Sequence, residues 1–275
     1  MDKATAEKLR QKARRIRAGV IEALGLGKPG HLGGSMSAAD MVTVLYYYKM
    51  NIDPKNIKKP DRDRFIMSKG HSVLAQYAAL ADLGYYPWEE LSRTKTLGGL
   101  LQGHPEISTP GIEANTGSLG QGVSLGVGMC LGAKRDKAAW RVFVMCGDAE
   151  LAEGQIWEGA TAAAHYKLDN LRVLVDANGV SATGRVSERY NVGDAAGIAA
   201  KFAAFGWNAR VIDGHSVEEI GDALDAADQV KGKPSAIIGK TIKGKGVSFA
   251  EDSHVYHNKD MNEETRAKAL AEINA

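Results

Sequence analysis

The stretch R141-V-F-V-M-C-G-D-A-E150 joins an apolar run to an acidic turn. Residues 141–146 have the length and apolar character of a buried β-strand, and this strand stops at Gly147-Asp148. Such an ending can be an ordinary turn, because glycine and aspartate both favour turns. It can also present the carboxylate of Asp148 to a metal ion. The rest of the chain has to distinguish these two interpretations.

The pattern after this stretch predicts the fold. Apolar strands alternate with helical segments, and this order predicts parallel strand pairing. We expect a three-layer α/β fold, a doubly wound, mostly parallel sheet with helices on both faces. Further strands are predicted over 64–71 (a short strand running into a loop), 171–175, 208–212 and 235–238, and helices over 4–24, 37–48, 73–83, 118–135, 155–166, 195–205, 217–230 and from 260 onward.

Residues 1–275 contain no repeat, low-complexity segment or linker, so a single domain is expected. The helix over 37–48 is expected to open on Ser37, with a Ser-x-x-Asp cap that ends at Asp40. Glycine is unusually frequent, at 32 of 275 residues, and clusters at element boundaries. Such glycines let the backbone approach a ligand closely, often a phosphate.

Composition excludes several classes of protein. Lys plus Arg (35) nearly balances Asp plus Glu (33), so no strongly basic face for nucleic acid is expected. No apolar run is long enough to span a bilayer, and the charged N-terminus does not resemble a signal peptide. Cys130 and Cys146 are the only cysteines and form no CxxC motif, which fits buried thiols in a reducing cytoplasm.

A second polar residue follows the next predicted strand. Asn178 ends V173-L-V-D-A-N178, and the carboxyl ends of parallel strands meet at one edge of the sheet. Asp148 and Asn178 should therefore lie close together there. A carboxylate, a carboxamide and a backbone carbonyl form a hard-oxygen set that suits Mg²⁺ or Ca²⁺. Either residue alone is more simply a turn residue, but the pair favours a metal site.

This pair resembles the thiamine diphosphate motif, in which Gly-Asp-Gly is followed at a distance by Asn. More narrowly, the chain is similar to the transketolase family. The segments that carry the resemblance occur in the right order over nearly the whole chain: G30-H-L-G-G-S-M-S-A-A-D40, D61-R-D-R-F-I-M-S-K-G-H71, Q102-G-H-P-E106, T116-G-S-L-G-Q-G122, G147-D-A-E-L-A-E-G-Q-I-W-E158, D213-G-H215 and K240-T-I-K-G-K-G246.

The resemblance implies a cofactor site for thiamine diphosphate and Mg²⁺, with Ca²⁺ or Mn²⁺ as substitutes. The implied metal ligands are Asp148, Asn178 and the backbone carbonyl of Val180. The implied cofactor contacts are His71, Gly117 and Leu119 for the aminopyrimidine side, Gly147 and Ala149 for the diphosphate, and the apolar side chain of Ile242. A diphosphate must be neutralised before it can enter a protein pocket, which is the physical need for the metal.

Four histidines match active-site positions of the family. His31, His71, His104 and His257 could move protons to and from substrate hydroxyls. His254 competes with His257 for the last of these assignments. His165 is interpreted as structural, and His215 as a loop ligand or a turn residue.

Glu153 matches a family glutamate at the subunit interface, where a proton relay links paired sites. An acid favoured by the dipole of the helix that follows explains Glu153 almost equally well. The run G239-K-T241 is no P-loop, because Pro234 stands where the first glycine should be. Ala149 replaces the usual second glycine of the motif, and we expect it to adopt a negative φ so that the site survives.

Full transketolases are more than twice as long, and the resemblance ends with the diphosphate-binding domain. It therefore implies the N-terminal subunit of a split transketolase, whose partner carries the pyrimidine-binding and C-terminal domains, most simply in an α2β2 assembly. The expected reaction transfers a two-carbon ketol unit from a ketose to an aldose, with phosphorylated pentose sugars as the default. The alternatives are a fragment similar to deoxyxylulose-phosphate synthase, a subunit with a non-catalytic binding or regulatory role and, least favoured, a dinucleotide-binding protein.

Overall fold

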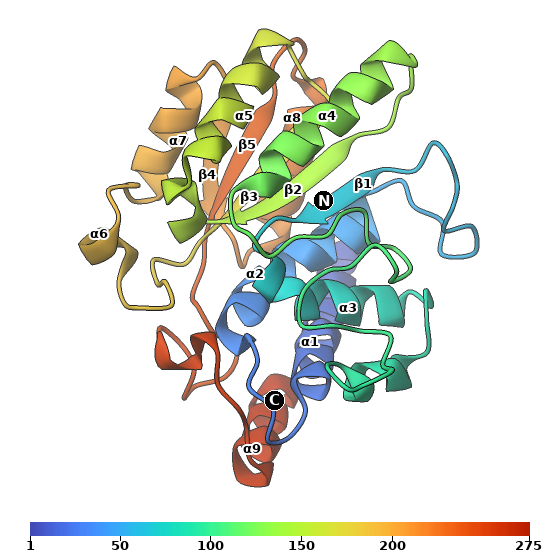
Figure 1. Cartoon of the computed structure of the whole chain (residues 1–275), viewed down its shortest axis with the longest axis vertical. Coiled ribbons are helices and arrows are strands. Elements are labelled where there is room, and N and C mark those ends of the chain that lie inside the picture. Colours follow the sequence, from blue (N-terminus) through green and yellow to red (C-terminus); the bar gives the residue numbers. More distant parts are fainter.

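The computed structural model describes residues 1–275 and contains one five-stranded sheet in which every strand pairs in parallel (Figure 1). The strand order is β1-β2-β3-β5-β4. The strands are β1 (Arg64–Met67), β2 (Val142–Gly147), β3 (Leu171–Ala177), β4 (Asn208–Asp213) and β5 (Ser235–Lys240). The helices are α1 (Lys3–Leu24), α2 (Leu32–Val44), α3 (Val73–Asp82), α4 (Gln121–Arg135), α5 (Gly154–His165), α6 (Val186–Arg189), α7 (Ala195–Ala204), α8 (Val217–Gln229) and α9 (Glu263–Asn274). The predicted fold class is confirmed.

Helices cover both faces of the sheet. Along β2, Phe143 and Met145 point into a core shared with α1, α2, α3, α8 and α9, whereas Val142, Val144 and Cys146 point into a core shared with α4, α5 and α7. Figure 1 shows α4, α5 and α7 side by side over one face. Successive side chains of a strand point to opposite faces, so a strand that is apolar throughout must be covered on both. No helix is long and apolar enough to cross a membrane.

The predicted cap at Ser37 is wrong. Helix α2 begins at Leu32, and Ser37 lies buried inside it, where its hydroxyl donates to Asp176 Oδ2 at 2.5 Å. The helix can start earlier because Gly34 allows a close approach: a Cβ there would lie 2.5 Å from Ser72 Oγ. The sequence Ser-x-x-Asp therefore marks two inward-facing polar residues, since Asp40 is also buried.

The carboxyl ends of the strands bring distant segments to one edge of the sheet. Residues Gly147 of β2 and Asp176 of β3 are direct neighbours in the register. The segments after β1, β2, β3 and β5 all leave from this edge, and the N-terminus of α2 reaches it from below (Figure 1). At this edge, parallel sheets commonly bind their ligands.

Candidate active site

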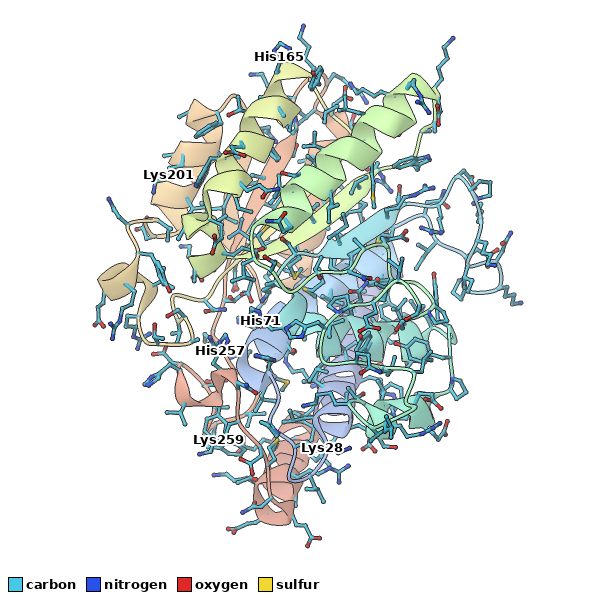
Figure 2. All side chains as sticks on the ribbon, in the orientation of Figure 1. Lys28, His71, His165, Lys201, His257 and Lys259 are labelled. Carbon is cyan, nitrogen blue, oxygen red and sulfur yellow. The ribbon has the colours of Figure 1, made fainter.

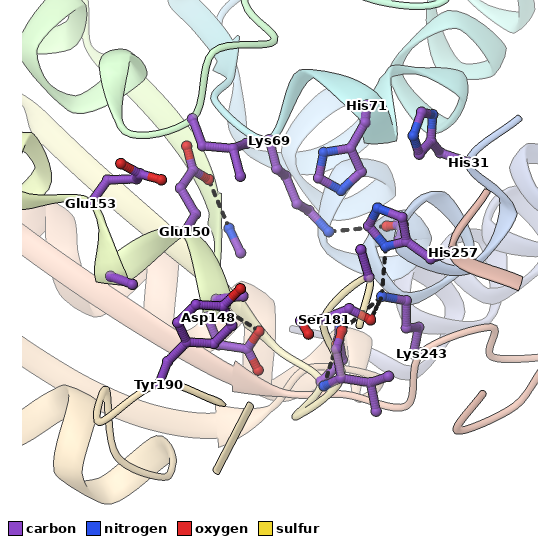
Figure 3. A pocket seen from close by; sticks show the side chains of 18 of the residues that line it. His31, Lys69, His71, Asp148, Glu150, Glu153, Ser181, Tyr190, Lys243 and His257 are labelled. Carbon is purple, nitrogen blue, oxygen red and sulfur yellow. Dashed lines mark hydrogen bonds between the residues drawn. The ribbon is translucent and has the colours of Figure 1, made fainter. Parts of the chain in front are cut away.

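A cavity of about 330 Å³ lies at this edge. All the predicted site residues except Ile242 line it: His31, His71, His104, Gly117, Leu119, Gly147, Asp148, Ala149, Glu153, Asn178, Val180 and His257. In Figure 3, Asp148 and Glu153 lie on one side of the cavity, and the labelled histidines lie on the other. The site is thus divided into an acidic side and an imidazole side.

The three predicted metal ligands lie together. Asp148 Oδ2 accepts the Gly179 N–H at 2.6 Å, and Asn178 Oδ1 accepts the Val180 N–H at 3.0 Å. One turn therefore orients both side chains. The structure has no cluster of three or more His, Cys, Asp or Glu side chains that could hold a metal. A carboxylate, an amide oxygen and a carbonyl are nevertheless the ligands that Mg²⁺ and Ca²⁺ prefer, so these residues fit such an ion.

Electrostatics at Asp148 point the same way. Burial raises the pKa of this carboxyl group, because the charged form loses its hydration. A bound cation would offset that penalty. The Val180 carbonyl, the third predicted ligand, accepts a hydrogen bond from the ammonium of Lys243 at 2.7 Å, which leaves one of its two lone pairs for a metal ion.

Ala149 departs from the glycine of the motif without backbone strain. It opens a short helical turn, Ala149–Ala152, and is not among the non-glycine residues with positive φ. The expected negative φ is confirmed. The N–H groups of Gly147 and Ala149 donate within their own loop, to Glu150 Oε2 at 3.0 Å and to Asp148 Oδ1 at 2.7 Å. Both predicted backbone donors to the diphosphate are therefore engaged by carboxylates.

Two lysines of the cavity were missed by the sequence analysis. Lys69 is buried and forms an ion pair with the fully buried Asp176, while donating to the Gly34 carbonyl at 3.0 Å. Lys243 is buried too, and burial followed by the charge of Lys69 lowers its pKa to about 8. Both lie on the histidine side of the cavity (Figure 3). They lie in the quoted motifs, so their motif positions were a usable signal.

The four predicted histidines form one cluster. The ring of His31 lies 5.1 Å from that of His71, 5.8 Å from that of His104 and 5.3 Å from that of His257, measured between centroids. Burial is the main cause that lowers the pKa of His31 to about 4, and the neighbouring His104 is the second cause. Burial also lowers the pKa of His71 well below its usual value. The lowered pKa values keep His31 and His71 neutral near pH 7.

His257 has a fixed tautomer and a fixed position. Its Nδ1 lies 2.9 Å from Lys243 Nζ, which can only donate, so Nδ1 accepts and the ring proton sits on Nε2. Burial and Lys243 together lower the pKa of His257 to about 3. The segments before His31 and after His257 are joined by an antiparallel bridge between Gly30 and Lys259. The Gly30 N–H donates to the Lys259 carbonyl at 3.3 Å, and the Lys259 N–H donates to the Gly30 carbonyl at 3.1 Å.

The remaining histidines lie outside the cavity. His254 is exposed, so the structure favours His257 over it. Figure 2 shows His165 at the far end of α5, away from His71 and His257. His215 holds a loop: its Nδ1 lies 2.7 Å from Asp40 Oδ2, and its Nε2 accepts the Ile242 N–H at 2.8 Å.

Ile242 and Glu153 sit differently from the other predicted residues. The side chain of Ile242 is 37% exposed and does not line the cavity, since the bond to His215 fixes its backbone instead. Glu153 lies exposed at the cavity rim in the N-cap position of α5, and its side chain makes no capping bond. Its carboxylate is thus free to meet a ligand or a neighbouring chain.

Comparisons with known proteins agree with this geometry. Residues 9–272 match the transketolase, thiamine diphosphate binding domain family. The chain is 41% identical over 266 residues to the 6-deoxy-6-sulfo-D-fructose transketolase subunit of a Clostridium species, covering 96% of both chains. It is 38% identical over 267 residues to an apulose-4-phosphate transketolase subunit of Phocaeicola vulgatus, covering 97% of this chain and 94% of that one.

Full-length transketolases match over part of their length. Transketolase from Campylobacter jejuni superposes with a TM-score of 0.87 at 33% identity, covering 100% of this chain and 43% of that one. Human transketolase is 35% identical over 275 residues and is likewise covered over 43% of its length. The chain therefore belongs to the transketolase family and corresponds to that family's thiamine diphosphate binding domain.

Proposed function

We propose that the chain is the N-terminal subunit of a two-chain transketolase that depends on thiamine diphosphate and Mg²⁺. One observation carries the proposal: a single cavity combines a hard-oxygen set, two lysines and four clustered histidines. Asp148, Asn178 and the Val180 carbonyl would hold the metal. Lys69 and Lys243 would complete the neutralisation of the diphosphate.

The histidines define the chemistry that the chain itself would perform. Thiamine diphosphate, when bound, supplies the nucleophilic carbon that breaks the C–C bond of a ketose. Ketol transfer also moves protons at substrate hydroxyl and carbonyl oxygens. A neutral imidazole can accept or donate one proton there, and His31, His71 and His257 have lowered pKa values that keep them neutral. His257 would donate from Nε2, because its Nδ1 accepts from Lys243.

A second chain is needed for activity in this proposal. Two relatives of nearly the same length are named as transketolase subunits, and full-length transketolases are more than twice as long. We infer a partner that carries the pyrimidine-binding domain, in an α2β2 complex. The chain itself would contribute one domain, the diphosphate-binding one. Because Cys130 and Cys146 are both buried and unpaired, we also infer that it works in the reducing cytoplasm.

The substrate is proposed as a ketose donor and an aldose acceptor that carry an anionic group. The names of the two relatives specify a sulfonated and a phosphorylated sugar. This broadens the default of pentose phosphates.

The proposal is tested by purifying the chain with the product of the adjacent reading frame. Ketol transfer should require both chains, thiamine diphosphate and Mg²⁺, and the single chain should be inactive. Turnover by the single chain would refute the split enzyme. Cofactor binding by the pair without ketol transfer to any sugar would favour a synthase-like fragment or a regulatory role.

A further inference from the structure

One buried carboxylate in the cavity wall, that of Glu150, has no part in the proposed function. Glu150 is 2% exposed and lies two residues beyond Asp148. Its Oε1 accepts the Ser68 hydroxyl at 2.5 Å and the Gly120 N–H at 2.9 Å, and its Oε2 accepts the Gly147 N–H at 3.0 Å. The three donors come from three segments: the end of β1, the loop before α4 and the end of β2. One side chain thus joins three walls of the cavity.

Helix α4 depends on this carboxylate for its N-terminal cap. Its N-cap residue, Gly120, has a φ of 85° and makes no side-chain capping bond. Glu150 accepts the N–H of Gly120, and Ser68 Oγ accepts that of Gly122 at 3.2 Å. Residues from two other elements therefore satisfy the first donors of the helix, and an anion there is stabilised by the helix dipole.

The loop that Glu150 holds is the one that lines the cavity with Gly117 and Leu119. This loop packs closely against its neighbours: a Cβ on Gly70 would lie 2.7 Å from the Thr116 carbonyl, and a Cβ on Gly120 would lie 2.7 Å from Glu153 Cβ. Close packing fixes the distance of the loop from the segments that carry Gly70 and Glu153. Hydrogen bonds to Glu150 fix its orientation, because they are directional and charge-assisted.

We propose that Glu150 is a positioning residue that orients the loop of Gly117 and Leu119 relative to the Gly147–Asp148 turn, and thereby sets the affinity of the site for thiamine diphosphate. The proposal rests on the proposed function in one respect, the identity of the ligand. The loop and the turn would face opposite ends of that ligand. A shift between them would then weaken binding even when the metal ligands are intact.

Glu150→Gln tests the proposal, because the amide keeps the size of the side chain but cannot accept at both ends. Its NH₂ group would face one of the backbone N–H donors. Asp63→Asn is the control for general destabilisation. Asp63 is also 2% exposed and accepts backbone N–H groups, from Asn51 at 2.8 Å and Arg141 at 2.7 Å, but it lies at the other edge of the sheet. It also forms a salt bridge with the Arg141 side chain at 2.6 Å, which Glu150 lacks, so Asp63→Asn should cost at least as much stability as Glu150→Gln.

Two readouts are needed on the chain with its partner subunit. Hydrogen exchange of the peptide that spans 116–122 should be faster in Glu150→Gln by roughly tenfold and unchanged in Asp63→Asn. Binding of thiamine diphosphate with Mg²⁺, followed by calorimetry, should weaken by about tenfold or more only in Glu150→Gln. Ser68→Ala, which removes one of the three contacts, should shift both readouts in the same direction by a smaller factor, and it provides the test if Glu150→Gln does not fold.

The outcomes separate this proposal from the proposed function. Unchanged exchange over 116–122, or wild-type cofactor affinity in Glu150→Gln despite faster exchange, would overturn the role of Glu150. Equal losses of affinity in Glu150→Gln and Asp63→Asn would also overturn it, since general destabilisation would then explain both. If wild-type protein binds no thiamine diphosphate, the proposed function fails, and the exchange data still decide whether Glu150 orients the loop.

Discussion

The substitution Asp148→Asn is the most direct test of the candidate metal site, because Asp148 is the only carboxylate among the three proposed ligands. Both carboxylate oxygens accept backbone N–H groups, from Ala149 at 2.7 Å and Gly179 at 2.6 Å. Asparagine can satisfy only one of them, and an unsatisfied buried donor costs about 1–3 kcal/mol. Removing a charge that burial already disfavours offsets part of this cost. The unliganded variant should therefore fold, with a modest loss of stability.

Its response to ligand should be very different from that of the wild type. At cofactor and Mg²⁺ concentrations of about 100 times the Kd, binding stabilises the wild type by about 2.7 kcal/mol. For a domain of this size, that raises Tm by roughly 5–10 °C. Loss of a metal ligand should weaken binding at least about 100-fold, since loss of an outer-shell partner alone costs roughly 10–100-fold. The variant would then gain about 0.4 kcal/mol, or roughly 1 °C.

Thermal unfolding of the subunit pair, with and without thiamine diphosphate and Mg²⁺, measures this difference. Asp169→Asn is the control, because Asp169 also accepts a backbone N–H, that of Gly232 at 2.9 Å, but does not line the cavity. The control should keep the full ligand-induced rise in Tm. A full rise in Asp148→Asn would refute the assignment of the metal ligands.

Other expected outcomes concern stability. Lys69→Met should lower the free energy of unfolding by about 3–5 kcal/mol in urea titrations, because it leaves Asp176 as an unpaired buried charge. A loss below about 1 kcal/mol, which is typical of a salt bridge on the surface, would contradict this. Gly126→Ala should lower the free energy of unfolding by about 1–3 kcal/mol, because the new Cβ would lie 2.8 Å from a β2 side chain. Gly128→Ala should raise it by about 0.5–1 kcal/mol, because no atom lies within 4 Å of the new Cβ. Equal effects of the two substitutions would exclude the packing explanation. Acidification from pH 6.5 towards 3 should lower the free energy of unfolding, because burial holds the pKa of His257 at about 3 in the folded chain, whereas the unfolded histidine takes up its proton at higher pH. His257→Asn should reduce the dependence of this free energy on pH. An unchanged pH dependence would argue against the shifted pKa.

The sequence predicted the sheet and most of the cavity because both depend on local patterns. Apolar runs that end in polar residues mark strand ends, and parallel pairing brings those ends to one edge. Asp148 and Asn178 could be paired by this reasoning alone. The four histidines could not, since nothing in their spacing shows that their loops meet. The family resemblance supplied them, and the structure brings them together.

What the sequence could not show depends on tertiary contacts. Lysines are usually exposed, and the burial of Lys69 is explained only by its pairing with Asp176 across the sheet edge. Ser37 has the pattern of a helix cap but donates to that same carboxylate. Ile242 belongs to a matching motif, yet the bond from its backbone to His215 leaves its side chain outside the cavity. In each case a distant partner overrides the local pattern.

The bridge between Gly30 and Lys259 has a consequence for biosynthesis. It joins the segments that carry His31 and His257, which come from opposite ends of the chain. During translation the N-terminal helices can fold as they emerge, but the imidazole cluster cannot close until residues 255–259 have left the ribosome. A nascent or C-terminally truncated chain would thus expose an unfinished cavity. Ribosome-bound chains that end before residue 255 lack His257, so they should show no ketol transfer, even when the partner chain is present.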